Sequence, residues 1–238
     1  MTPQELKFKQ MTEPPVEKLI CKLAVPCIIS MLVTSFYNMA DTFFVGMLND
    51  PIQNAAVTLV YPVMLAFNAV NNLFGVGASS MMSRALGRRD YETVQRASAF
   101  GFYCALFSGV LFSVLVALFY EPLLTLLGTP DSIIGWCTNY LKIYFYGIAG
   151  FFFYNMLSGV LRGLGDSVSA LLYLIVAALL NVVLDLLFVK EMGVAGVALA
   201  TIISQGISAA LCFIHLLWVD APYKIRIKEI RFHKKSFL

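Results

Sequence analysis

The stretch VSALLYLIVAALLNVVLDLLFV, residues 168–189, contains a single charged side chain, Asp185. A bilayer core of about 30 Å is crossed by about 20 apolar residues in helical conformation. The stretch is therefore long enough to span a membrane as one helix. Five further apolar runs of similar length predict five more spans, which are Leu23–Gly46, Ala55–Met82, Ala97–Tyr120, Ile133–Leu161 and Gly193–Val219.

The composition indicates an all-α integral membrane protein. Hydrophobic residues make up 59% of the 238 positions and charged residues 13%, which excludes an ordinary soluble domain. The runs are far longer than the alternating strands of about 10 residues that build a membrane barrel. Short polar segments separate the runs, and short loops imply antiparallel neighbours. We therefore expect a six-helix bundle in the cell (inner) membrane.

Basic residues are sorted to one side of this bundle. Of the 17 lysines and arginines, 15 lie before or at the start of the first run, between the second and third, between the fourth and fifth, or after the sixth. Lys142, near the start of the fourth helix, and Lys190 fall on the opposite side. The positive-inside rule predicts that both termini are cytoplasmic.

The chain divides into three parts. Residues 1–18 form a polar cytoplasmic segment that lacks the apolar core of a removable signal peptide. Residues 19–219 form the transmembrane lobe, and residues 220–238 form a basic cytoplasmic tail or linker. Two interpretations of this tail stay open, an interfacial segment lying on anionic headgroups and a solvated linker.

Two acidic residues, Asp41 and Asp185, lie within apolar runs. A carboxylate in hydrocarbon is costly, so such residues usually face a bundle interior or a water-filled cavity on an ion or substrate path. A rise of about 1.5 Å per residue places Asp41 about 8 Å and Asp185 about 6 Å below the outer ends of their helices. The alternative is that Asp185 has no functional role and is tolerated because it lies near a helix end, about one turn from Lys190.

Two neutral polar residues are predicted at a similar depth. Asn181 precedes Asp185 by four residues and so shares its helix face, and Thr201 lies about 12 Å below the outer end of the last helix. Carboxylate, amide and hydroxyl oxygens suit Na⁺, and a carboxylate can instead take up H⁺. Taken alone, Asn181 and Thr201 are more typical of polar groups that join membrane helices than of an ion site.

Other residues suggest a cavity and a moving helix. Pro26 interrupts the hydrogen-bond ladder of the first helix and allows a bend there. The fourth run carries aromatic residues from Tyr144 to Tyr154, followed by Asn155. These rings either line a cavity for flat organic cations or pack against lipid and neighbouring helices.

Three motifs carry a resemblance to a known family. Residues Tyr37 to Gly46 read YNMADTFFVG, residues 77–87 read GASSMMSRALG, and residues 161–166 read LRGLGD. With the six-helix spacing, these motifs resemble the multidrug and toxic compound extrusion (MATE) family over nearly the whole chain. The resemblance implies export of small organic, mostly cationic, compounds by exchange for Na⁺ or H⁺.

The resemblance also implies roles for single residues. The family's cation-site motif falls on Asp41, Asn181, Asp185 and Thr201, its helix-bending proline on Pro26, and substrate or network positions on Tyr37 and Asn155. Family members have about twelve helices in two lobes, so this chain resembles the amino-terminal lobe and is expected to need a second lobe or another copy. No cofactor besides the coupling ion, and no nucleic-acid partner, is expected.

Three rival functions remain as alternatives. Gly163-Leu164-Gly165-Asp166 fits the Gly-x-Gly-Asp pattern of intramembrane aspartyl proteases, but such enzymes need two adjacent carboxylates, and Asp166 is predicted about 25 Å or more from the other two. We therefore expect no enzyme. A lipid-linked sugar flippase should carry cationic groups in its cavity, and none is found. A non-transporting membrane scaffold is the remaining alternative.

Overall fold

The structure is a computed structural model that describes residue 9 and residues 13–218. The predicted tail 220–238 and nearly all of the segment before Glu13 lie outside this described part. Six long helices make up nearly all of the described chain, as predicted. They are α2 (Val16–Met47), α3 (Pro51–Gly87), α4 (Tyr91–Leu126), α5 (Asp131–Gly163), α6 (Ser167–Met192) and α7 (Val194–Trp218).

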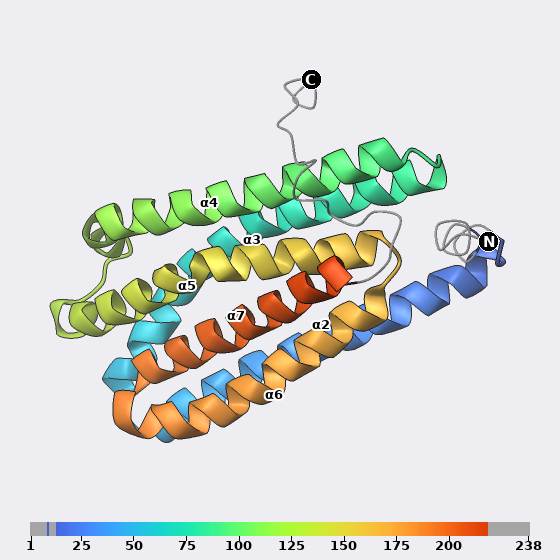
Figure 1. The fold of residues 1–238 in the computed structure, drawn as a ribbon. Coiled ribbons are helices and arrows are strands. Elements are labelled where there is room, and N and C mark those ends of the chain that lie inside the picture. The colour runs from blue at the N-terminus through green and yellow to red at the C-terminus, as the bar shows by residue number, and fades with distance from the viewer. Residues whose placement is uncertain (1–8, 10–12, 219–238) are drawn as a thin grey trace.

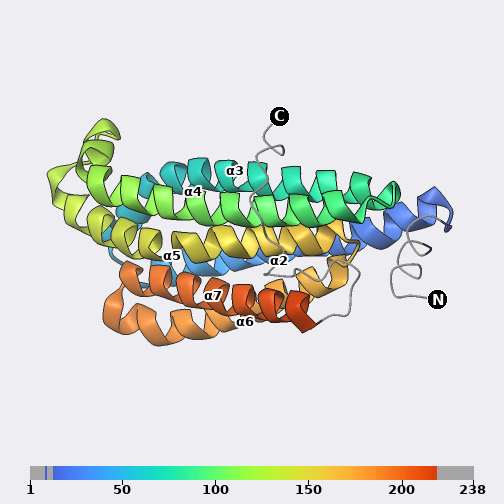
Figure 2. The ribbon, with the colours of Figure 1, turned by 45° about the horizontal axis from the view of Figure 1, so that its top comes forward.

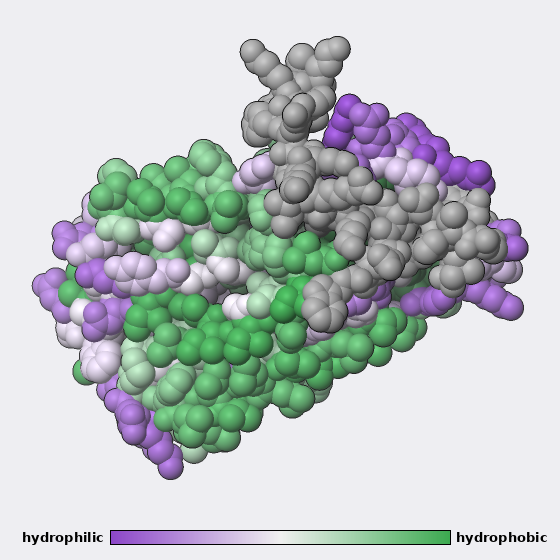
Figure 3. Space-filling view, viewed as in Figure 1, coloured by the Kyte–Doolittle hydropathy of each residue, from purple (hydrophilic) through white to green (hydrophobic). Residues whose placement is uncertain are grey.

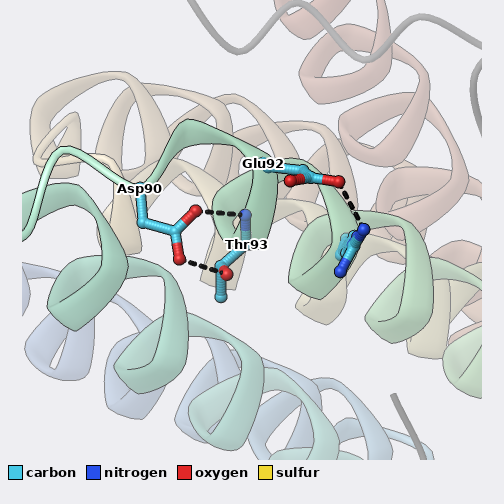
Figure 4. Close-up of polar contacts among 4 residues, drawn as sticks. Asp90, Glu92 and Thr93 are labelled. Carbon is cyan, nitrogen blue, oxygen red and sulfur yellow. Dashed lines mark hydrogen bonds and ion pairs between the residues drawn. The ribbon is translucent and has the colours of Figure 1, made fainter. Parts of the chain in front are cut away.

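The helices extend beyond the apolar runs into segments that the sequence suggested as loops. The polar segment from Arg84 to Arg96 was expected to join two helices, but only residues 88–90 of it are non-helical. Figure 4 shows why α4 begins early: Asp90 accepts a hydrogen bond from the backbone N–H of Thr93 at 3.0 Å and another from the Thr93 hydroxyl. These bonds, the hydroxyl first, lower the pKa of Asp90.

The expected helix end at Glu121-Pro122 is also wrong. The helix α4 continues to Leu126 and bends at Phe119, whose φ of −119° and ψ of 16° are non-helical. Pro122 cannot donate to the carbonyl four residues earlier, which accounts for a bend at this place. Lys142, expected near a helix start, lies well inside α5, about three turns after Asp131.

The helices form an elongated bundle in which α5 is central (Figures 1 and 2). The helix α5 packs against α3, α4 and α7, and α7 packs in turn against α6. The first helix, α2, contacts mainly α6 and hardly touches α3, which follows it in the chain. The bundle therefore has a firmly packed middle and one helix at its edge.

Small residues allow α3 and α5 to approach closely. A Cβ atom added to Gly159 would lie 2.9 Å from the backbone oxygen of Gly75, and one added to Gly163 would lie 3.0 Å from the Cα atom of Ser79. Both helices thus present small residues four apart, the spacing that brings membrane helices into backbone contact. Ser83 adds a hydrogen bond from its hydroxyl to the carbonyl of Gly163 at 2.9 Å.

A polar clamp joins two turns at the end of the bundle opposite the start of α2. The Gln53 side chain accepts a hydrogen bond from Val194 N–H at 3.1 Å and donates to Asp50 at 3.0 Å. Asp50 also accepts from Ile52 N–H at 2.9 Å, and these bonds, that of Gln53 first, lower its pKa. The clamp fixes the first turn of α3 against the start of α7.

The surface fits a membrane. Green, apolar atoms cover most of the middle of the face shown in Figure 3, with purple, polar atoms at its two ends. All six helices are long and apolar enough to cross a bilayer. The sidedness of the termini stays a prediction.

Candidate cation site

A pair of carboxylates lies where α2 crosses α6. Asp41 and Asp185 each lie about two turns before the last residue of their helix, so both are about 10 Å from the same end of the bundle. The two carboxyl groups lie close enough together to repel each other when both are charged. Asp185 and its neighbour Asn181 are fully buried, whereas Asp41 is half-buried.

Asn181 bridges the two aspartates. Its amide is oriented by its surroundings: with the nitrogen toward the carboxylates, it donates to Asp41 Oδ1 at 2.9 Å and to Asp185 Oδ2 at 3.3 Å. In the opposite orientation the amide oxygen would face the carboxylate oxygens, which is repulsive. The bond to Asp41 therefore links α6 to α2, and the bond to Asp185 fixes the amide within α6.

Two further predicted residues join this group. The Thr201 hydroxyl on α7 lies 3.5 Å from the Asn181 amide and donates to Val197 O at 3.0 Å. Tyr37, one turn before Asp41 on α2, interacts with both Thr201 and Asp41. The structure thus brings together Asp41, Asn181, Asp185, Thr201 and Tyr37, as the sequence suggested.

Tyr140 and Tyr144 of α5 also lie beside this group. Tyr140 is near Asp41 and Asp185, Tyr144 is near Tyr37, and both phenol side chains are buried. Tyr140 was not identified from the sequence, although its spacing of four from Tyr144 places the two on one helix face. That spacing could have identified Tyr140 as a second phenol on the same face. A buried phenol usually has a hydrogen-bond partner, so such a residue is a candidate for a polar site.

Two predicted residues lie elsewhere. Asn155 lies about 16 Å beyond Tyr144 along α5 and donates to Phe151 O of its own helix at 3.0 Å. Pro26 lies about four turns before Asp41 on α2, and the helix runs through it without a break. Ser30 donates its hydroxyl to Pro26 O at 2.8 Å.

Comparisons with known proteins show the family and the fold of the chain. A family model described as MatE matches residues 26–187, about two thirds of the chain. The chain belongs to the MatE family. The multidrug export protein MepA of Staphylococcus aureus is 30% identical over 202 residues, which cover 84% of this chain and 45% of MepA.

Solved MATE structures share the fold. A structure described as the outward-facing conformation of a multidrug resistance MATE family transporter superposes with a TM-score of 0.89 at 28% identity, over 96% of this chain and 51% of that one. A MOP superfamily transporter from Pyrococcus furiosus gives 0.86 at 29% identity, over 92% and 49%. This MatE chain is thus a multi-pass cell membrane protein that matches one lobe, and it spans about half the length of these relatives.

Asp166, the acidic residue of the LRGLGD motif, lies far from Asp41 and Asp185 in this fold. Asp166 caps α6 at its first turn, accepting from Ser169 N–H at 3.3 Å, and lies 3.3 Å from the Nε2 atom of His215. Asp166 and Asp185 stand at opposite ends of α6, about 28 Å apart along the helix. Asp166 therefore does not form, with Asp41 or Asp185, the pair of adjacent carboxylates that an intramembrane aspartyl protease requires.

The carboxylate pair has the chemistry to attract a cation. Two adjacent, largely buried carboxylates repel each other, so a proton or a metal cation between them is favourable. The Asp185 Oδ1 atom is buried without a hydrogen-bond partner, which leaves an acceptor open to such an ion. Within the described residues no group of three or more His, Cys, Asp or Glu side chains is found, so the oxygens of Asn181 and Thr201 would have to complete a metal site.

Proposed function

We propose that this chain is the amino-terminal lobe of a cation-coupled multidrug exporter. The observation that carries the proposal is the pair Asp41 and Asp185, joined by Asn181 between an edge helix and the bundle. A cation bound there offsets one of the two negative charges, removes most of the repulsion between the carboxylates and holds α2 against α6. Release of the ion leaves two repelling carboxylates between the same helices, which favours their separation. Ion binding would thereby be coupled to the position of α2.

The coupling ion is Na⁺ or H⁺, and the Asn181 amide distinguishes how each would bind. The amide nitrogen faces both carboxylates, so a proton on either aspartate leaves its hydrogen bonds in place. Na⁺ needs oxygen ligands, so the amide would have to turn by half a rotation to present its oxygen. The proposed Na⁺ ligands are then Asp41, Asn181, Asp185 and Thr201.

The proposed substrate is a small organic cation, as the relatives are named multidrug exporters. Tyr37 contributes a phenol next to Asp41, and a cation above an aromatic ring is attracted to its face. Substrate and coupling ion would then compete for the same negative charge. Asn155 is proposed as a more distant substrate contact, toward the end of the bundle where α2 begins.

Transport would require a second six-helix lobe or another copy of the chain. The matched relatives are about twice as long as this chain, and α2 exposes most of its side chains along its length. Both termini are proposed to be cytoplasmic, which places the carboxylate pair in the outer half of the membrane. Pro26, which removes one backbone hydrogen bond from α2, is proposed as the point where this helix bends.

Export from cells that lack other pumps tests the proposal. We expect cells producing the chain to accumulate less of a fluorescent organic cation and to resist it. Asp41→Asn and Asp185→Asn should each return accumulation to the level of cells without the protein, because each removes the negative charge that binds the ion. Membrane levels of each variant are measured alongside.

The matched control is Asp131→Asn, which removes an exposed carboxylate at the start of α5, away from the pair. It should export like the parent. Full activity in both Asp41→Asn and Asp185→Asn, beside an active parent, would rule out the proposed coupling site.

A further inference from the structure

The outer half of α5 carries a polar and aromatic stripe on its exposed face. Trp136, Asn139, Lys142 and Tyr146 are all exposed and recur every three or four residues, so they lie in line along one side of the helix. Tyr146 is 82% exposed. In Figure 3 a pale to purple band crosses the bundle between greener surfaces, in the region where Figure 1 draws α5. We call these four residues the α5 stripe.

Lys142 is the charged member of the stripe. Its ammonium group lies 4.6 Å from the centre of the Tyr120 ring, a cation–π contact that satisfies the charge only in part. The ion pairs found among the described residues are Lys9 with Glu13, Arg96 with Glu92 and His215 with Asp166. Lys142 thus lies on an exposed face of the bundle and forms no ion pair with a carboxylate among the described residues.

The carboxylate pair cannot serve as this partner. Lys142 follows Tyr140 by two residues, which turns it by about 200° around α5. Tyr140 is buried beside Asp41 and Asp185, whereas Lys142 points out on the opposite face. The two groups therefore share a depth but are separated by the body of the helix.

Depth and neighbours suit a lipid headgroup. Tyr120, which Lys142 contacts, lies about two turns before the end of α4 and directly before the charged Glu121, so the ammonium group is near the expected border of the hydrocarbon. Trp and Tyr prefer this border because their rings are apolar and their N–H or O–H groups are polar. Gly150, one turn beyond Tyr146, has open space where a Cβ atom would stand, which leaves room for an acyl chain.

We propose that the α5 stripe binds an anionic phospholipid. The lipid phosphate lies on Lys142, Asn139 and the Trp136 indole N–H offer hydrogen bonds to the headgroup, and an acyl chain runs over Tyr146 past Gly150. Charge complementarity favours this occupant over a zwitterionic lipid, since the only formal charge of the stripe is positive. The inference does not depend on the proposed transport function.

Lipid retention by the purified chain tests the inference. The protein in mild detergent is mixed with phosphatidylglycerol or phosphatidylcholine of identical acyl chains, and bound lipids are counted by native mass spectrometry. One lysine near a lipid headgroup contributes about a fivefold preference for the anionic lipid. We expect the parent to retain phosphatidylglycerol about fivefold better, and Lys142→Gln to abolish the preference.

Two variants control for folding and for general charge. Lys142→Arg keeps the charge and should keep the preference. Lys190→Gln removes an exposed lysine near the same end of the bundle, on α6, and should behave like the parent. Equal retention of both lipids by the parent, or a preference that survives Lys142→Gln, would overturn the inference. So would a disulfide dimer of Tyr146→Cys in phosphatidylglycerol vesicles, because it would show that a second copy covers the stripe.

Discussion

The helices α2 and α5 are nearly equal in length and opposite in their relation to the bundle. The helix α5 buries 16 of its 33 residues, whereas α2 buries three of 32. Backbone-close packing on α3 and contacts with α4 and α7 hold α5 in place. The helix α2 rests on α6 and is tied there by the hydrogen bond between Asp41 and Asn181.

This difference shows how an ion could control a helix. Moving α5 would break packing along three neighbours at once, which is costly in a close-packed interior. Moving α2 mainly disturbs one interface, whose polar contact is the carboxylate pair. One carboxylate thus lies on the helix with the fewest contacts and the other on the bundle, so the charge state of the pair acts on the main interface that holds α2.

The largest expected effect comes from deleting a ring in the α5 core. Phe152→Ala empties a fully buried site and should lower the free energy of unfolding by about 3–5 kcal/mol. The same change at Phe36 of α2, whose side chain is 68% exposed, should cost less than about 0.5 kcal/mol. Thermal unfolding in detergent measures both, and similar losses would remove the contrast between the helices.

A bulkier residue at the α3–α5 contact should have the next largest effect. Gly159→Val pushes a side chain against the backbone of Gly75 and should destabilise the fold by about 1–3 kcal/mol or more. Gly77→Val introduces the same residue into α3 where nothing lies within 4 Å, so it controls for helix propensity. Denaturant unfolding compares them, and an unaffected Gly159→Val would contradict the close approach.

The polar clamp at Gln53 should matter less. Gln53→Ala removes the hydrogen bonds of this side chain with Val194 N–H and Asp50 and should lower the free energy of unfolding by about 1 kcal/mol. Hydrogen exchange should then rise at the first turn of α7 while α2 is unchanged. Thr58→Ala, which removes a hydroxyl that bonds within its own helix, is the matched control. Faster exchange throughout α2 would mean that the clamp also holds the edge helix.

The smallest expected effect is a change in how stability falls at acidic pH. The pKa of Asp90 is lowered in the folded protein, so its contribution to stability is present at neutral pH and is lost as the pH falls through that lowered value. The loss is expected below about pH 4, near the ordinary value for aspartate. Asp90→Asn keeps a capping side chain that does not titrate. Its unfolding temperature should therefore fall less steeply between about pH 5 and pH 3, and identical slopes would refute this role.

Much of the fold followed from the sequence because lipid imposes a simple rule on length and polarity. Six apolar runs became six helices, and Asp41 and Asp185 met because both lay at one depth on neighbouring helices. Helix ends were predicted less well. Asp90 starts α4 before the apolar run begins, and Pro122 bends α4 instead of ending it, since capping and bending depend on hydrogen bonds that hydropathy does not reveal.

Side-chain orientation was the other limit. The sequence placed Asn181 beside Asp185, but the bridging direction of its amide depends on Asp41 from a distant helix. Tyr140 was missed although its spacing of four from Tyr144 put the two on one helix face, because the many aromatic residues of this helix did not show which face is buried. Lys142 was assigned to a helix start because charge was assumed to lie at the helix ends, whereas an aromatic ring accommodates it farther inside.

Counting the cations bound by the purified chain tests the central claim most directly. Sodium binding at equilibrium and proton uptake are measured for the parent, Asp41→Asn, Asp185→Asn and the double variant. The account predicts one monovalent cation shared by the pair, lost in either single variant, with no further loss in the double variant. A cation that remains bound in one single variant, with losses that add up in the double variant, would show two separate sites and contradict it.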